Sequence, residues 1–187
     1  MLGAALAAAA GVAVYAATAG PSNLVSVNTN GKSFMVQNLP DKEEASKRMA
    51  SIQEKLQKLI TRYRDDPATA VEPRVKTMME RFKPENICES NMDDSTTSYS
   101  ENKGNRIVIC LRQKTDGYPF VEENTVMFVV LHEMAHLMTY STGHTPEFWA
   151  NFRRMLQDAI AVGIYENVNY ARTPTPYCGI EITDSPL

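Results

Sequence analysis

Three histidines lie close together in this 187-residue chain, and two of them are four residues apart in the run His132-Glu133-Met134-Ala135-His136. On a helix, a four-residue step places two side chains on one face about a turn apart, so both imidazoles can reach one Zn²⁺ at about 2.0 to 2.1 Å. Glu133 occupies an adjoining part of the same helix surface. It can therefore act on a zinc-bound water without being a ligand itself.

A catalytic zinc normally takes three protein ligands and leaves a fourth position for water. His144 is the predicted third ligand, because Gly143 ends the helix and lets the chain turn back toward the metal. Zinc would lower the pKa of the water toward about 7. Glu133 would take the proton as the water attacks a peptide carbonyl and return it to the leaving amine. The pattern therefore predicts a zinc-dependent endopeptidase with Glu133 as its general base.

Other patterns for the third ligand fit this chain less well. A metzincin needs glycine at position 139 and histidine at position 142, where Thr139 and Thr142 stand. A thermolysin-like site takes a carboxylate from a later helix, and Asp158 or Glu166 could supply it. A single histidine in an apolar helix is ordinarily a satisfied core residue, but two histidines and a glutamate in the least polar helix favour a metal site.

The helix that carries these residues is predicted from about 124 to 142, and it is apolar on nearly every side. We therefore expect it to be the central buried helix. A further helix follows it, with Thr145 as cap, Pro146 in its first turn and Glu147 matching the helix dipole. Its inner face is predicted to contain Phe148, Trp149, Phe152, Leu156 and Ile160.

Helices and short strands are predicted before the histidines. Apolar residues at three- and four-residue steps indicate an amphipathic helix over 41–66, and a shorter helix over 75–82 ends before a proline. Between 86 and 112 the pattern is that of short β-strands, of which Arg106–Leu111 is the most regular. This mixture of helices and strands predicts an α+β domain.

The histidine run, the seven-residue gap before His144 and the following Phe148-Trp149 resemble the zinc signature of the WLM and SprT-like metallopeptidases. The resemblance is specific over 124–149 and extends more loosely from Arg106 to Gly179. This longer stretch also resembles WLM-type proteins of large double-stranded DNA viruses, where a membrane-anchored form is found. It implies a small zincin-like fold, in which a short antiparallel sheet packs on the active-site helix and its flanking helices.

The same resemblance implies roles for individual residues. His132, His136 and His144 would be the zinc ligands, and Glu133 the general base. The strand Arg106–Leu111 would lie along the cleft and pair with an extended protein or peptide substrate. A tyrosine or arginine would stabilise the oxyanion, and the candidates are Tyr170, Arg172 and Tyr177.

The amino-terminal segment is predicted to be a transmembrane anchor over 1–20, because residues 2–19 carry no charge. A cleaved signal peptide, ending at Ala17-Thr18-Ala19, and a packed soluble helix are the alternatives. A linker is expected over 21–40 and the metallopeptidase domain over 41–187. The basic residues follow the anchor, so the positive-inside rule puts the carboxy-terminal domain on the cytoplasmic side or in a virion interior.

The expected partners are a protein substrate, the membrane through residues 2–19, and a large viral capsid assembly. A net charge of −3 argues against nucleic acid as a partner, because gripping phosphates needs a basic face. A different class of function stays open: a structural membrane or virion protein, of the minor capsid type, whose zinc site mainly stabilises the fold.

Three cysteines, Cys88, Cys110 and Cys178, are an odd number without metal-like spacing. We expect buried reduced thiols, as in a reducing compartment, and a bridge between Cys88 and Cys110 is the alternative.

Overall fold

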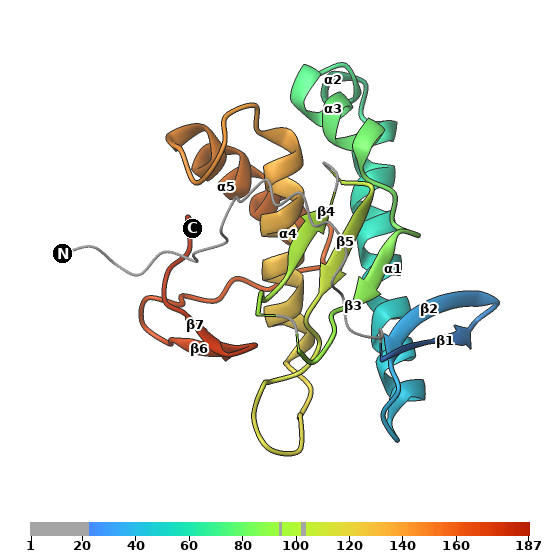
Figure 1. Ribbon diagram of the computed structural model, residues 1–187. Coiled ribbons are helices and arrows are strands. Elements are labelled where there is room, and N and C mark those ends of the chain that lie inside the picture. The colour runs from blue at the N-terminus through green and yellow to red at the C-terminus, as the bar shows by residue number, and fades with distance from the viewer. Residues whose placement is uncertain (1–22, 94, 102–103) are drawn as a thin grey trace.

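The computed structural model describes residues 23–93, 95–101 and 104–187. Within these ranges helices and short strands mix along the chain, which confirms the predicted α+β class (Figure 1). The helices are α1 (Lys42–Asp65), α2 (Pro67–Ala70), α3 (Pro73–Arg81), α4 (Glu123–Met138) and α5 (Pro146–Ala161). The strands are β1 (Leu24–Thr29), β2 (Lys32–Gln37), β3 (Ile87–Glu89), β4 (Tyr99–Glu101), β5 (Arg106–Ile109), β6 (Thr175–Tyr177) and β7 (Ile180–Ile182).

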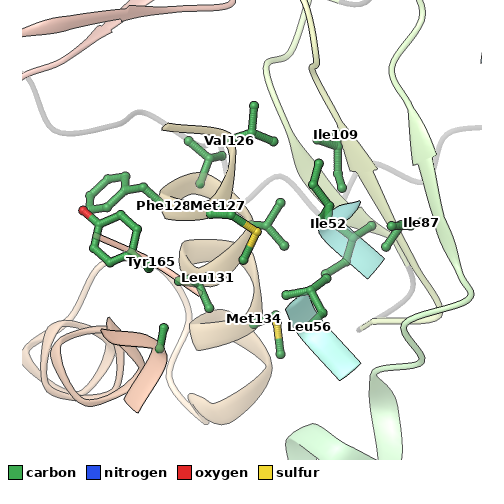
Figure 2. Packing of buried hydrophobic residues seen from close by; sticks show 14 of the residues in the cluster. Ile52, Leu56, Ile87, Ile109, Val126, Met127, Phe128, Leu131, Met134 and Tyr165 are labelled. Carbon is green, nitrogen blue, oxygen red and sulfur yellow. The ribbon is translucent and has the colours of Figure 1, made fainter. Parts of the chain in front are cut away.

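The core forms where α1, α4 and the three-stranded sheet meet (Figure 2). Helix α1 is amphipathic, and it buries Ile52 and Leu56 on its apolar stripe. Helix α4 is buried on nearly every side, as its composition predicts. Its Met127 and Leu131 are fully buried in the same hydrophobic cluster as the α1 side chains and Ile109 of β5. This packing fixes α4 between the sheet and α5.

The central sheet is mixed, in the order β3-β5-β4. Strand β4 runs antiparallel to β5, as predicted, whereas β3 runs parallel to it because β4 lies between them in sequence. The prediction that Arg106–Leu111 pairs with substrate is wrong for residues 106–109, since both edges of β5 are occupied by β3 and β4. Within the described residues, β3 and β4 are the two edge strands of this sheet.

Residues 24–37, in the range predicted as a linker, form a hairpin instead. Asn30 and Gly31 both have positive φ values, 53° and 77°. Such a pair makes the tight turn that the twist of two antiparallel strands favours. Apolar residues alternate with polar ones on either side of this turn, and Phe34 and Val36 are buried in the main cluster. The domain therefore includes this hairpin, which packs on α1.

The predicted transmembrane anchor at 1–20 lies outside the described residues. Among the residues that the structure describes, no helix is long and apolar enough to cross a membrane. This finding overturns the predicted single-pass membrane location. The longest described helix, α1, carries charged side chains along its length, and apolar α4 has 16 residues, fewer than the about 20 that a span needs.

A buried ion cluster holds the hairpin and α1 to the sheet. Arg112 is 2% exposed, and its Nε donates to Glu89 Oε1 at 2.9 Å while Nη1 donates to Asp41 Oδ2 at 2.8 Å. The second oxygen of Glu89 accepts the backbone N–H of Gln37 at 2.8 Å. The guanidinium also lies over the ring of Phe120, 4.1 Å from its centroid. One arginine therefore connects β2, the start of α1 and β3.

We expect Arg112→Met to lower the free energy of unfolding by about 3 to 5 kcal/mol, because Glu89 would keep a buried carboxylate without its partner. Urea denaturation measures this change. The control is Arg106→Met, which removes an exposed ion pair with Glu101 and should cost less than about 1 kcal/mol. Equal losses in the two variants would contradict the role given to the buried cluster.

Candidate metal and active site

Helix α4 brings His132 and His136 to one face, with their Nε2 atoms 3.2 Å apart. The helix ends at Met138, earlier than predicted, and Gly143 lies in the loop that follows rather than at the helix end. The physical reason is Thr139, whose backbone is extended and whose hydroxyl donates back to the carbonyl of Ala135 at 2.8 Å. The chain therefore leaves the helix three residues after His136.

The loop from 139 to 145 returns His144 to the other two histidines. Its Nε2 lies 3.0 Å from Nε2 of His132, and one ring nitrogen from each of the three residues lies within 4.8 Å of the others. His132 is buried, whereas His136 and His144 are partly exposed, so the cluster faces solvent on one side. The structure thus brings together the three histidines that the sequence singles out.

These residues fit a bound metal ion. Nitrogens at about 2.0 to 2.1 Å from a tetrahedral ion lie roughly 3.3 Å apart, close to the separations seen here. His132 Nε2 lies within hydrogen-bond distance of the Nε2 atoms of both other histidines. A ring nitrogen carries one proton or one lone pair, so it can make a good hydrogen bond to one of them at a time. One cation, by contrast, can bind all three nitrogens. Ligand imidazoles must be neutral. Burial lowers the pKa of His132 well below its usual value and that of His136 to about 4, with further lowering by neighbouring histidines.

Aromatic side chains at the start of α5 form one wall of the cluster. The ring of Phe148 stacks on His136, with centroids 4.3 Å apart, and meets His132 and His144 edge-on at 4.8 and 4.7 Å. The Trp149 ring lies 5.9 Å from that of His144. The Phe148-Trp149 pair therefore holds the imidazole planes from the side of α5.

Glu133 lies on the sheet side of α4. Its side chain is buried, and this burial raises the pKa of its carboxyl to about 8, while a hydrogen bond from the backbone N–H of Ser100 acts in the opposite direction. Ser100 is the central residue of β4, one of the two edge strands of the sheet. The structure therefore sets the glutamate between α4 and the edge of the sheet.

The three oxyanion candidates differ sharply in their surroundings. Burial raises the pKa of Tyr177, and the charge of Glu133 raises it further. Its hydroxyl lies 2.6 Å from Ser98 Oγ and donates to the carbonyl of Cys110 at 3.1 Å. Tyr170 is buried against Phe128, with ring centroids 4.7 Å apart, and Arg172 is exposed. Tyr177 is therefore close enough to Glu133 to interact with its charge.

The alternative carboxylate ligands do not join the cluster. Asp158 accepts a hydrogen bond from the hydroxyl of Tyr63 at 2.9 Å and lies 3.6 Å from Arg154. Glu166 is exposed, and its backbone pairs with the side chain of Asn124. Within the described residues, the group that could hold a metal ion consists of the three histidines.

The expectation of buried reduced thiols is wrong for two of the three cysteines, and the alternative bridge between Cys88 and Cys110 does not form. Cys110 and Cys178 form a disulfide, so neither is a reduced thiol, and Cys88 is buried outside this bond. The bridge ties the end of β5 to the residue that follows β6. It therefore anchors the β6–β7 hairpin, and with it Tyr177, beside the central sheet. The 68-residue separation of the two cysteines gave no local signal of this pairing.

An α+β domain whose central helix carries two histidines a turn apart, with a third supplied by the next loop, has three nitrogen ligands placed where one metal ion could bind them. The chain belongs to the WLM domain family, whose model matches residues 28–171. This is a family of metallopeptidases, and its match supports the predicted resemblance.

Individual proteins are also similar to this chain. An uncharacterized protein of Acanthamoeba polyphaga mimivirus is 32% identical over 177 residues, which are 91% of this chain and 87% of that protein. An uncharacterized protein of Invertebrate iridescent virus 6 is 31% identical over 81 residues, or 43% of this chain and 45% of that protein. The crystal structure of a Wss1 mutant from Saccharomyces cerevisiae has a TM-score of 0.52 at 21% identity. The match covers 68% of this chain and 86% of the Wss1 chain, and it shows that the two share a fold.

We expect the double variant Cys110→Ala/Cys178→Ala to unfold with a free energy about 2 to 4 kcal/mol lower than that of the oxidised wild type, because the bridge closes a long loop. Urea denaturation provides the measurement. A reducing agent should destabilise the wild type by a comparable amount and leave the double variant unchanged. A wild type that is indifferent to reduction would contradict the assigned bond.

Proposed function

We propose that this protein is a zinc-dependent endopeptidase in which His132, His136 and His144 hold the metal and Glu133 is the general base. The observation that carries the proposal is the convergence of the three Nε2 atoms on one point at the start of α5. When bound, zinc polarises a substrate carbonyl and lowers the pKa of water toward about 7. The family match supports the class of reaction.

The chain's own residues bind the metal and transfer the protons. Burial keeps the imidazoles neutral and ready to bind, and Phe148 restrains their planes. Glu133 takes a proton from the attacking water and delivers it to the leaving amine, so its carboxyl must change protonation state near neutral pH. A pKa raised by burial to about 8 in the metal-free protein suits the second of these transfers.

Strand β4 is the proposed binding edge for an extended protein or peptide substrate. It pairs with β5 along one side, and the N–H of Ser100 is directed to Glu133 on the other. A peptide that adds to this outer edge would therefore run past the general base. Since the net charge is −3, nothing in the overall charge favours a nucleic-acid partner.

The test uses the full chain and the variant Glu133→Gln. We expect about one zinc ion per chain in both proteins, measured by metal analysis, because Glu133 is not a ligand. Cleavage of an unfolded protein substrate should fall by at least about 100-fold in the variant, because proton transfer is lost. The matched control is Glu122→Gln, an exposed glutamate next to the same helix, which should cleave like the wild type.

Two outcomes would overturn the proposal. Full activity in Glu133→Gln would exclude the assigned base. A wild type that cuts no substrate, but unfolds when a chelator removes its zinc, would favour the alternative of a structural protein whose metal stabilises the fold. A capsid partner stays a prediction from the sequence and is not part of this proposal.

A further inference from the structure

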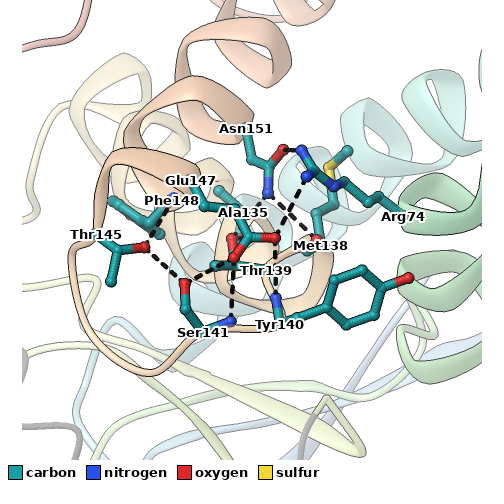
Figure 3. Close-up of polar contacts among 10 residues, drawn as sticks. All are labelled: Arg74, Ala135, Met138, Thr139, Tyr140, Ser141, Thr145, Glu147, Phe148 and Asn151. Atoms are coloured by element: carbon teal, nitrogen blue, oxygen red, sulfur yellow. Dashed lines mark hydrogen bonds and ion pairs between the residues drawn. The ribbon is translucent and has the colours of Figure 1, made fainter.

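The loop that carries His144 is closed by a glutamate at the start of α5. Glu147 Oε2 accepts the backbone N–H of Ser141 at 3.2 Å and the hydroxyl of the same residue at 2.7 Å (Figure 3). Its Oε1 accepts the backbone N–H of Tyr140 at 3.4 Å. Ser141 Oγ also lies 2.6 Å from Thr145 Oγ1, so one carboxylate and two hydroxyls join the beginning of the loop to its end.

Asn151, one turn further along α5, holds the point where α4 ends. Its Nδ2 donates to the carbonyl of Met138 at 3.2 Å and to Thr139 Oγ1 at 3.0 Å, and the residue is buried. Arg74 of α3 connects the two contacts, because its Nη1 donates to Asn151 Oδ1 at 3.2 Å and its Nη2 lies 3.5 Å from Glu147 Oε1 (Figure 3). We call Glu147, Asn151 and Arg74 the loop clamp.

The three metal-binding candidates differ in what fixes them. His132 and His136 are held by the backbone of α4, which the core surrounds. His144 lies in a loop without helix or strand, next to Gly143, whose φ is +82°. A site needs its side chains within about 0.5 Å of their working positions. Outside contacts must therefore restrict this loop, and the loop clamp supplies them.

We propose that Glu147 is a positioning residue that preorganises His144 for metal binding. The inference rests on the proposed function, because it requires the histidines to be ligands. An acidic residue in the first turn also stabilises a helix through its dipole. Here the carboxylate oxygens bond to Tyr140 and Ser141 of the preceding loop, so the role extends beyond α5 itself.

The test measures zinc affinity by competition with a chelator in Glu147→Ala and Glu147→Gln. We expect Glu147→Ala to weaken zinc binding by about 10- to 100-fold, the range found when a residue that orients a ligand is removed. Glu147→Gln keeps one acceptor oxygen and should lose less. In the metal-free proteins, hydrogen exchange of the Tyr140 and Ser141 amides should be faster in Glu147→Ala, which provides a readout without metal.

The matched control is Glu72→Ala. Glu72 also lies at the start of a helix and pairs with an arginine of a neighbouring helix, Arg154, but its carboxylate bonds to that arginine and not to the loop. We expect this variant to lose comparable thermal stability and to bind zinc within about twofold of the wild type, since distant sites act independently. Weaker zinc binding in Glu72→Ala, equal to that in Glu147→Ala, would make the effect one of global stability and overturn the inference.

A double-variant cycle with His144→Ala separates the remaining outcomes. If Glu147 acts through His144, Glu147→Ala should cause no further loss of zinc affinity in the His144→Ala background. The same loss in both backgrounds, or none in the wild type, would overturn the inference while the metal site stands. If Glu147→Ala does not fold, Glu147→Gln decides by the same criteria. A wild type that binds no zinc would overturn the proposed function itself, and this inference with it.

Discussion

The burial of α4 on nearly every side is the constraint on which the rest of the structure depends. A helix can carry histidine and glutamate among apolar neighbours only if their charges are suppressed or paired. Burial suppresses them here, because it lowers the pKa of His132 and raises that of Glu133 to about 8. The helix therefore carries an imidazole and a carboxyl group whose charged forms are both disfavoured by burial.

Short strands around such a helix need help from side chains and covalent bonds. Strands β3, β4 and β6 have three residues each, so each makes few backbone hydrogen bonds to the strand with which it pairs. Arg112 compensates at β3 and the hairpin, while the Cys110–Cys178 bridge and Gln113 hold the β6–β7 hairpin, with Gln113 bonded to Pro176 and Cys178. The positions around the site thus depend on a few specific links.

Much of the fold and site follows from local pattern, and the misses have physical causes. Helix α4 and the meeting of His132, His136 and His144 were predictable because helical spacing and one short loop determine them. The Asn30-Gly31 turn was a readable hairpin signal that the surrounding polar residues obscured. The Cys110–Cys178 pairing and the parallel β3–β5 contact could not be predicted, since both join segments whose proximity exists only in the folded chain.

The step from one residue to the next along α4 separates the two halves of the site. Successive residues of a helix are rotated by about 100°, so the side chains of His132 and Glu133 leave the helix in different directions. His132 points toward Phe148 and Phe152 of α5, where the three histidine rings lie together. Glu133 points toward Ser100 of β4. In the proposed function, an extended chain bound along that edge would therefore lie beside Glu133. The rotation along a single helix therefore sets His132, the proposed ligand, beside α5, and Glu133, the proposed base, beside the sheet.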